Sequence, residues 1–248
     1  MKNYLIILLF SFTTVLAGTL NIATAANVSY ALPRLIKEFQ KNNPQTKIQM
    51  TIGSSGKLTA QIMHGAPYDI FLSANMAYPK KLYEKGFALT KPVVYARGAL
   101  ALFSTKKRDF QQGTALVLDK NIRTIAIANP QTAPYGIAAR QALQNASLYK
   151  KIKKKLVYGE SVGQTVAYAV TAADLGFIAK SALFSPKMKQ YEEGVNFKDV
   201  DPKLYTPIAQ GIVLLKHATD NADAHSFYTF LLSQPAKEIF KAYGYSVQ

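Results

Sequence analysis

The segment KIQMTIGSSGKL, residues 47–58, holds three features in a row. Apolar and polar residues alternate over residues 47–52 as they do in a β-strand, Gly53-Ser54-Ser55-Gly56 forms a turn, and Leu58 begins a helical pattern that continues to Met63. A strand that leads through a small-residue turn into a helix is typical of α/β proteins, in which helices cover a largely parallel sheet.

The same strand-then-helix order recurs along the chain on both sides of this segment. Predicted strands lie at residues 20–24, 47–52, 68–72, 124–128, 155–158 and 175–179, and predicted helices at 28–39, 58–63, 76–85, 136–145 and 163–172, with two more inside 222–243. The predicted fold class is therefore α/β, with helices on the faces of each sheet.

Two long apolar runs, residues 93–103 and 208–215, do not fit a single strand followed by a helix. Each is long enough to leave one sheet and enter another. They predict two lobes: residues 18–95 plus 209–248 form lobe 1, and residues 96–208 form lobe 2.

Composition excludes several classes of protein. The chain has 248 residues, 49% of them apolar and 18% charged, which is a globular mixture and unlike a disordered chain. It has no Cys, which excludes disulfides, thiolate metal sites and cysteine nucleophiles. Its three His residues are scattered without a paired spacing, so the sequence predicts no metal site.

The N-terminus has the pattern of a secretory signal peptide. Lys2 precedes an apolar run over residues 4–16, and Val15-Leu16-Ala17 is a small-residue cleavage signal, so residues 1–17 are predicted to be removed after Ala17. An N-terminal element buried in the fold is the alternative. No Cys follows the run to carry a lipid, so the sequence predicts a soluble protein of the periplasm.

Positive charge is in excess, with 30 Lys and Arg against 14 Asp and Glu. The densest basic run, residues 150–155, lacks the interleaved aromatic residues of a nucleic-acid patch, and we interpret it as a solvated surface. No nucleic-acid partner is predicted, and the net charge of +16 favours solubility and weak steering of anions.

Four strand-to-helix turns share one chemistry. They contain Ala25-Ala26-Asn27, Gly53-Ser54-Ser55-Gly56, Pro134-Tyr135-Gly136 and Glu160-Ser161-Val162-Gly163. A helix start leaves backbone N–H groups without partners and carries partial positive charge, and small residues let a ligand approach the backbone. Such turns are suited to oxyanions.

Each turn taken alone has a plainer interpretation, because Ser and Asn are the usual N-terminal caps of helices. The argument for a ligand is their number and placement: two turns fall in each lobe, all at the carboxyl ends of strands, where open α/β sheets bind ligands. None of the four turns contains Lys or Arg, although Lys57 follows the second.

Five motifs in order carry a family resemblance: residues 25–27, residues 53–58, the run GAPYDIFLSA at 65–74, Asn129-Pro130 with 133–136, and the ending at 236–245. Together they make the mature chain similar to the periplasmic molybdate-binding proteins of ABC transporters. The resemblance implies the two-lobed venus-flytrap fold of type II periplasmic binding proteins, with a mixed sheet flanked by helices in each lobe.

The resemblance also implies a function and a set of ligand-binding residues. One tetrahedral oxyanion, molybdate or tungstate, binds in the interlobe cleft and is delivered to a membrane permease. The residues expected to hold it are Asn27, Ser55, Tyr135 and Val162, together with Ala26 and Ser54. The hydroxyl that other members of the family place late in the chain falls at Ala179, and Tyr135 is expected to replace it.

Three further side chains near these turns have open roles. Asp69 is interpreted as a structural carboxylate and not as a ligand, Lys180 as a charge on the rim, and Glu160 as a side chain that points outward. The sequence predicts a monomer that has no catalytic residue and no cofactor.

The alternatives are a binding protein for another small oxyanion such as sulfate, an exported hydrolase and a surface interaction module. A hydrolase is disfavoured because Ser54-Ser55 lacks a nucleophile elbow.

Overall fold

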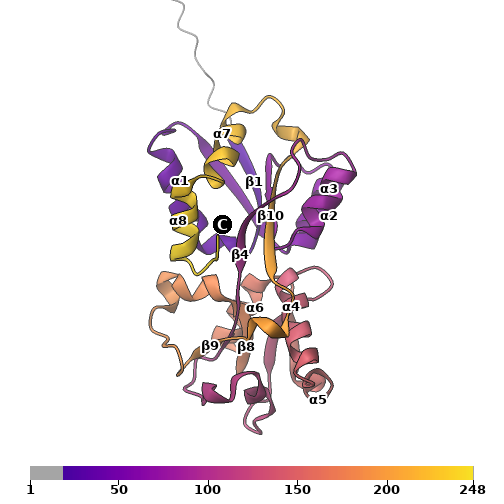
Figure 1. Cartoon of the computed structure of the whole chain (residues 1–248), viewed down its shortest axis with the longest axis vertical. Coiled ribbons are helices and arrows are strands. Elements are labelled where there is room, and N and C mark those ends of the chain that lie inside the picture. The colour runs from indigo at the N-terminus through magenta and orange to yellow at the C-terminus, as the bar shows by residue number, and fades with distance from the viewer. Residues whose placement is uncertain (1–18, 248) are drawn as a thin grey trace, which may run out of the picture.

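The computed structural model describes residues 19–247, so the predicted signal peptide lies outside the described residues. Within residues 19–247, ten strands form two sheets of five strands each. The two sheets lie in two lobes, one above the other in Figure 1, and the C-terminus lies in the same lobe as β1. The predicted α/β class, with a mixed sheet in each lobe, is confirmed.

The first sheet has the strand order β2-β1-β3-β10-β4. The strands are β1 (Thr19–Ala25), β2 (Lys47–Gly53), β3 (Ile70–Leu72), β4 (Val93–Gly98) and β10 (Ile208–Leu214). β1 is parallel to both β2 and β3, whereas β10 is antiparallel to β3 and β4. The carboxyl ends of β1 and β2 therefore meet at one edge of the sheet.

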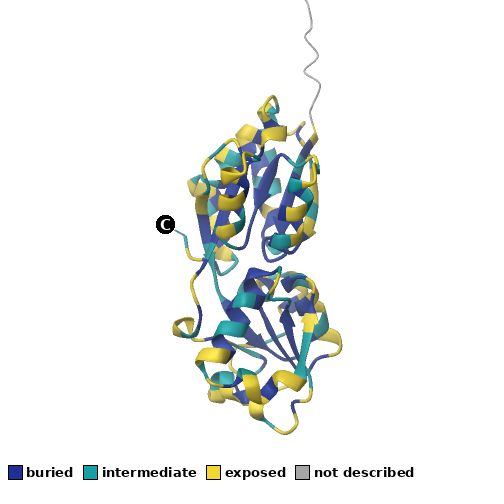
Figure 2. Cartoon of the chain, turned by 90° about the vertical axis from the view of Figure 1, so that its right-hand side faces the viewer, coloured by how far each residue is buried: buried dark blue, intermediate teal, exposed yellow. Residues whose placement is uncertain are grey.

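Helices cover both faces of this sheet. Helices α1 (Leu32–Gln40), α7 (Ala222–Leu231) and α8 (Gln234–Ala242) lie on one face, and α2 (Ser55–Met63) and α3 (Ala77–Glu84) on the other (Figure 1). Side chains alternate between the faces: Ile22 packs with the α1 side and Ala23 with the α2 side. Such strands are buried on both faces, as the dark strands of Figure 2 show.

The second sheet repeats this plan with the order β7-β6-β8-β5-β9. Its strands are β5 (Leu100–Phe103), β6 (Ile125–Ala128), β7 (Leu156–Gly159), β8 (Leu175–Ala179) and β9 (Phe197–Asp199). β6 is parallel to β7 and β8, and β5 is antiparallel to β8 and β9. The helices of this lobe are α4 (Pro134–Asn145), α5 (Tyr149–Ile152) and α6 (Val162–Thr171).

The chain crosses between the sheets at the two predicted apolar runs. β4 ends at Gly98 in the first sheet and β5 begins at Leu100 in the second, so residues 93–103 serve both sheets. The return runs from β9 to β10, and Gly98 pairs with Ile208 where the two connections lie side by side. The predicted lobe limits at residues 95 and 208 stay a prediction, although β4 continues in the first sheet to Gly98.

Some elements were not predicted from the sequence, because their hydrophobic patterns are weak. The three-residue β9, the one-turn α5 and the 3-10 helix η2 (Phe110–Leu118) had no counterpart among the predicted elements. In the basic run 150–155, the Lys155 ammonium donates to the carbonyls of Val117 and Asp119, so this residue ties down the end of η2 and is not merely solvated. Among the described residues, no helix is both long and apolar enough to cross a bilayer.

Candidate functional site: four helix starts around one cavity

The first turn leads from β1 into the short 3-10 helix η1 (Val28–Tyr30). Asn27 precedes η1 and is fully buried, and its side chain makes no capping hydrogen bond. Its amide nitrogen Nδ2 donates to Gln210 Oε1 at 2.8 Å and to the Tyr245 hydroxyl at 3.0 Å. The capping interpretation is therefore wrong for Asn27.

The second turn leads from β2 into α2, whose first residue is Ser55. Ser55 is fully buried, and its hydroxyl oxygen accepts a hydrogen bond from the Ala74 backbone N–H at 3.0 Å. The hydroxyl proton of Ser55 remains available to a ligand. Ser54 does not cap α2, and its hydroxyl donates to Glu160 Oε1 in the other lobe at 3.1 Å.

The third turn leads from β6 into α4, which begins with Pro134. Proline suits this first position because its missing N–H would have no helical partner. Tyr135 follows and is almost fully buried. Gly136 is needed here, because a Cβ at this position would collide with the Ala128 carbonyl group.

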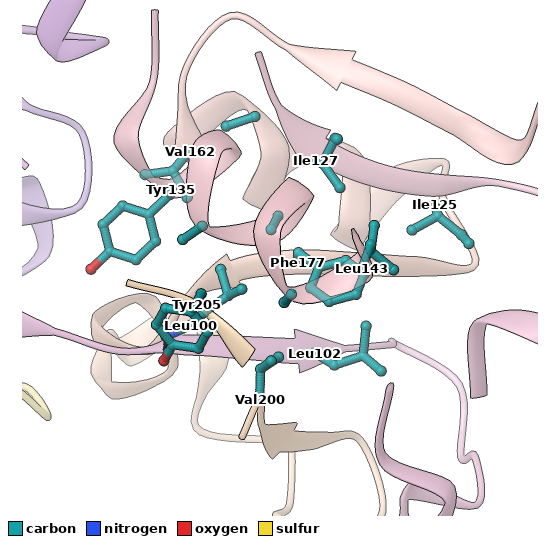
Figure 3. Packing of buried hydrophobic residues seen from close by; sticks show 14 of the residues in the cluster. Leu100, Leu102, Ile125, Ile127, Tyr135, Leu143, Val162, Phe177, Val200 and Tyr205 are labelled. Atoms are coloured by element: carbon teal, nitrogen blue, oxygen red, sulfur yellow. Dashed lines mark hydrogen bonds between the residues drawn. The ribbon is translucent and has the colours of Figure 1, made fainter. Parts of the chain in front are cut away.

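The fourth turn leads from β7 into α6, whose first residue is Val162. Ser161 is the cap of this helix, since its hydroxyl accepts a hydrogen bond from the Gln164 N–H at 3.3 Å. The capping interpretation is correct for Ser161. Val162 is 4% exposed and lies beside Tyr135 at the edge of the second-lobe core (Figure 3).

The four turns meet at one cavity between the lobes. All six predicted ligand-binding residues line it: Ala26, Asn27, Ser54, Ser55, Tyr135 and Val162. The sequence reasoning did not name the other lining residues, which are Ala25, Gly53, Ala74, Ala133 and Pro134. The free space between these residues is small, about 180 Å³ including the open solvent at its mouth, so the site has no room for a sizeable organic ligand.

The lining of the cavity has no charged side chain, so neither Lys nor Arg is present in it. Among the hydrogen bonds of residues 19–247, none starts at the backbone N–H of Asn27, Ser55, Tyr135 or Val162. Burial raises the pKa of the Tyr135 hydroxyl well above its usual range, so this group stays a neutral donor. Free N–H groups at helix starts are suited to an anion.

The Tyr135 hydroxyl lies at the crossing strands. It is 3.5 Å from Gln210 Nε2, and a Cβ on Gly98 would collide with it. Its ring points away from the aliphatic side chains of the core (Figure 3). Tyr135 therefore connects the third turn to both β4 and β10.

The sequence matches the family described as bacterial extracellular solute-binding protein over residues 20–246. The chain belongs to this family. The match spans nearly all of the described residues and both lobes, so the assignment covers the whole fold.

Within this family, the solute-binding protein is similar to proteins whose ligand is named. It is 35% identical to the molybdate-binding protein ModA of Azotobacter vinelandii over 235 residues, which cover 94% of this chain and 91% of that one. It is 36% identical to ModA of Rhodobacter capsulatus, with 92% and 88% covered. The structure resembles that of the Azotobacter vinelandii periplasmic molybdate-binding protein with a TM-score of 0.85 at 34% identity, covering 92% of this chain and 99% of that one. The predicted family resemblance and the two-lobed periplasmic-binding-protein fold are confirmed.

Two neighbouring charged side chains have structural roles in this solute-binding protein. The buried Asp69 carboxylate accepts a hydrogen bond from the Asn21 N–H at 2.7 Å and contacts His217 Nδ1 at 2.8 Å. Lys180 pairs with Asp199 on the surface. Neither residue lines the cavity.

The lobes also touch at the mouth of the cavity. The Gly56 N–H donates a hydrogen bond to the Thr132 carbonyl at 2.9 Å. The Glu160 carboxylate accepts a hydrogen bond from the Ser54 hydroxyl and lies 3.9 Å from the Lys57 ammonium. Glu160 is half exposed, but it does not simply point outward as expected, because it bridges the two lobes. These contacts hold the lobes together beside the cavity.

Proposed function

We propose that this protein binds molybdate, and tungstate with it, in the cavity between its lobes. The observation that carries this proposal is the cavity itself, which is small, free of charged side chains and surrounded by the starts of four helices. Its similarity over both lobes to molybdate-binding proteins supports the choice of anion. The protein binds its ligand without a reaction and needs no cofactor.

Each predicted residue has a role in this proposal. The backbone N–H groups of Asn27, Tyr135 and Val162 donate to the anion, and Ser55 adds its N–H and hydroxyl. Ala26 and Ser54 complete the wall on the side of lobe 1. Hydrogen bonds to charged groups contribute about 1.5–3 kcal/mol each, so several of them can hold a dianion without a counter-cation.

Size and protonation decide selectivity. Sulfate has the charge and shape of molybdate but is smaller, so it makes poorer contacts with the same donors. Hydrogen phosphate carries a proton that needs an acceptor, and a lining of donors rejects it. Molybdate and tungstate are close in size and are both accepted.

The cellular role follows from the same proposal. Residues 1–17 direct export, cleavage after Ala17 releases a soluble periplasmic monomer, and the closed lobes present the captured anion to the permease of an ABC transporter. Lobe closure is a shift toward the closed form that the anion favours. Nucleic acid is not a partner.

Isothermal titration of the mature protein with molybdate, tungstate, sulfate and phosphate tests the proposal. We expect tight binding of the first two, weaker binding of sulfate and no binding of phosphate, with chloride as the control. A rise in melting temperature with molybdate but not with chloride is the matching thermal result. Sulfate binding more tightly than molybdate would instead identify a sulfate-binding protein, and phosphate binding as tightly as molybdate would contradict the selectivity argument.

Gly56→Val is expected to weaken molybdate binding by about tenfold by preventing full closure. A Cβ at Gly56 would lie 2.9 Å from the Thr132 carbonyl oxygen and 3.0 Å from its Cα, and backbone cannot move aside as a flexible side chain can. A tenfold loss corresponds to about 1.4 kcal/mol.

The control for this variant is Lys57→Ala at the next position. Lys57 lies 3.9 Å from a half-exposed carboxylate, and an ion pair of this kind contributes little. Titration should give near-normal affinity for Lys57→Ala. Normal affinity for Gly56→Val would show that the Gly56–Thr132 contact is not needed for closure.

A further inference from the structure

A buried polar network joins the two lobes behind the cavity, and Gln210 lies at its centre. Gln210 is fully buried in β10, where the register with β4 shifts. Its Oε1 accepts hydrogen bonds from the Tyr95 hydroxyl at 2.7 Å and from Asn27 Nδ2 at 2.8 Å, and its Nε2 lies 3.5 Å from the Tyr135 hydroxyl. Gln210 therefore contacts one ligand-binding residue from each lobe.

One atom in this network has no partner. Among the described residues, the buried side-chain atoms without a hydrogen bond are Asn27 Oδ1 and Arg108 Nε. Only Asn27 lines the anion cavity. Because Nδ2 of Asn27 is held by Gln210 and Tyr245, the unpartnered oxygen is the side-chain atom left for the guest, and an oxygen acceptor repels a dianion.

This conflict disappears if the side-chain amides of Asn27 and Gln210 both rotate so that each exchanges the positions of its oxygen and its nitrogen. Gln210 Nε2 then takes the former place of Oε1 and donates to Asn27 Oδ1, while Gln210 Oε1 accepts from the Tyr135 hydroxyl. The Tyr95 hydroxyl then accepts a hydrogen bond from Gln210 Nε2. It still donates its own proton to the Ser73 carbonyl, which lies 3.4 Å away.

The other partners of Asn27 also tolerate the reversal. The Tyr245 hydroxyl now donates to the Asn27 carbonyl at 2.8 Å and can redirect its proton to Oδ1. The Asn27 carbonyl keeps the Ser181 hydroxyl, at 2.9 Å, as a donor. Every polar atom then has a partner, and the N–H groups of Asn27 Nδ2 face the guest.

We propose that Gln210 is a positioning residue of the anion site, whose amide reverses together with that of Asn27 when the anion binds, so that Asn27 presents a donor in place of an acceptor. This inference rests on the proposed function. It makes Gln210 a specificity determinant as well, since the unreversed Asn27 oxygen would accept the proton of hydrogen phosphate.

A double-mutant cycle with Gln210→Met and Asn27→Ala tests the positioning role. Methionine keeps the volume of the side chain but removes its hydrogen bonds. We expect Gln210→Met to weaken molybdate binding about tenfold in the wild-type background and less than twofold in the Asn27→Ala background. An equal loss in both backgrounds would show that Gln210 acts only on general structure and would overturn the proposal.

A second variant, Gln210→Glu, tests the reversal through selectivity. A carboxylate only accepts hydrogen bonds, so it holds Asn27 Nδ2 in the present orientation and keeps Oδ1 toward the guest. Molybdate and hydrogen phosphate are both dianions at pH 8, so the added negative charge weakens both alike. We expect the ratio of molybdate affinity to phosphate affinity to fall at least tenfold, and an unchanged ratio would contradict the reversal.

Melting temperatures of the ligand-free variants show whether each one folds. Failure of the wild-type protein to bind molybdate would reject the proposed function itself. Normal binding by the wild type, with no coupling between positions 27 and 210, would reject only this inference.

Discussion

Val162→Pro is expected to weaken molybdate binding by about 10- to 100-fold and to leave the fold intact. The substitution removes one backbone N–H that we propose donates to the anion, and a hydrogen bond to a charged group contributes about 1.5–3 kcal/mol. The position makes the experiment clean, because Val162 is the first residue of α6, where proline is well tolerated.

The residue before position 162 is also compatible with proline. Ser161 has φ −134° and ψ 168°, which is the extended conformation that a following proline favours. The hydroxyl of Ser161 still accepts the Gln164 N–H, so the helix keeps its cap. Pro134 already occupies the equivalent first position of α4 in the facing turn.

The control is Val162→Ala, which shortens the same side chain but keeps the N–H. Titration should show affinity close to wild type for Val162→Ala and a large loss for Val162→Pro. Circular dichroism and melting temperature show that both fold. Equal affinities for the two variants would mean that the Val162 N–H does not contact the anion.

The candidate site could be predicted from the sequence because its chemistry is local. A strand, a turn of small residues and a helix start occur within about ten residues at Ser55 and at Val162, and the exposed N–H groups follow from the helix itself. The convergence of four turns then follows from a general property of α/β sheets, whose carboxyl strand ends face the ligand.

The partners of these residues could not be predicted, because they come from distant parts of the chain. Gln210 lies 183 residues from Asn27, and nothing around it in β10 distinguishes it from a polar residue on an exposed strand face. Glu160 looked like an outward-facing acid, but its contact with Ser54 exists only once the lobes meet. Side-chain networks between lobes depend on packing that local patterns do not encode.

Ser55→Ala is expected to reduce molybdate affinity by about 10- to 100-fold, again through one hydrogen bond to a charged group. The buried hydroxyl of Ser55 accepts the Ala74 N–H at 3.0 Å and Ser55 lines the cavity, so the hydroxyl proton is available to a bound anion. The alanine variant also leaves the Ala74 N–H buried without an acceptor, which costs about 1–3 kcal/mol of folding free energy. Both affinity and melting temperature should therefore fall.

Ser73→Ala separates these two effects. Ser73 is equally buried, its hydroxyl accepts the Asn75 N–H at 3.2 Å, and it does not line the cavity. Its loss should lower the melting temperature but leave molybdate affinity unchanged in titration. If both serine variants lost affinity alike, the cavity would be responding to a general loosening of the lobe, and the Ser55 hydroxyl would have no direct part in holding the anion.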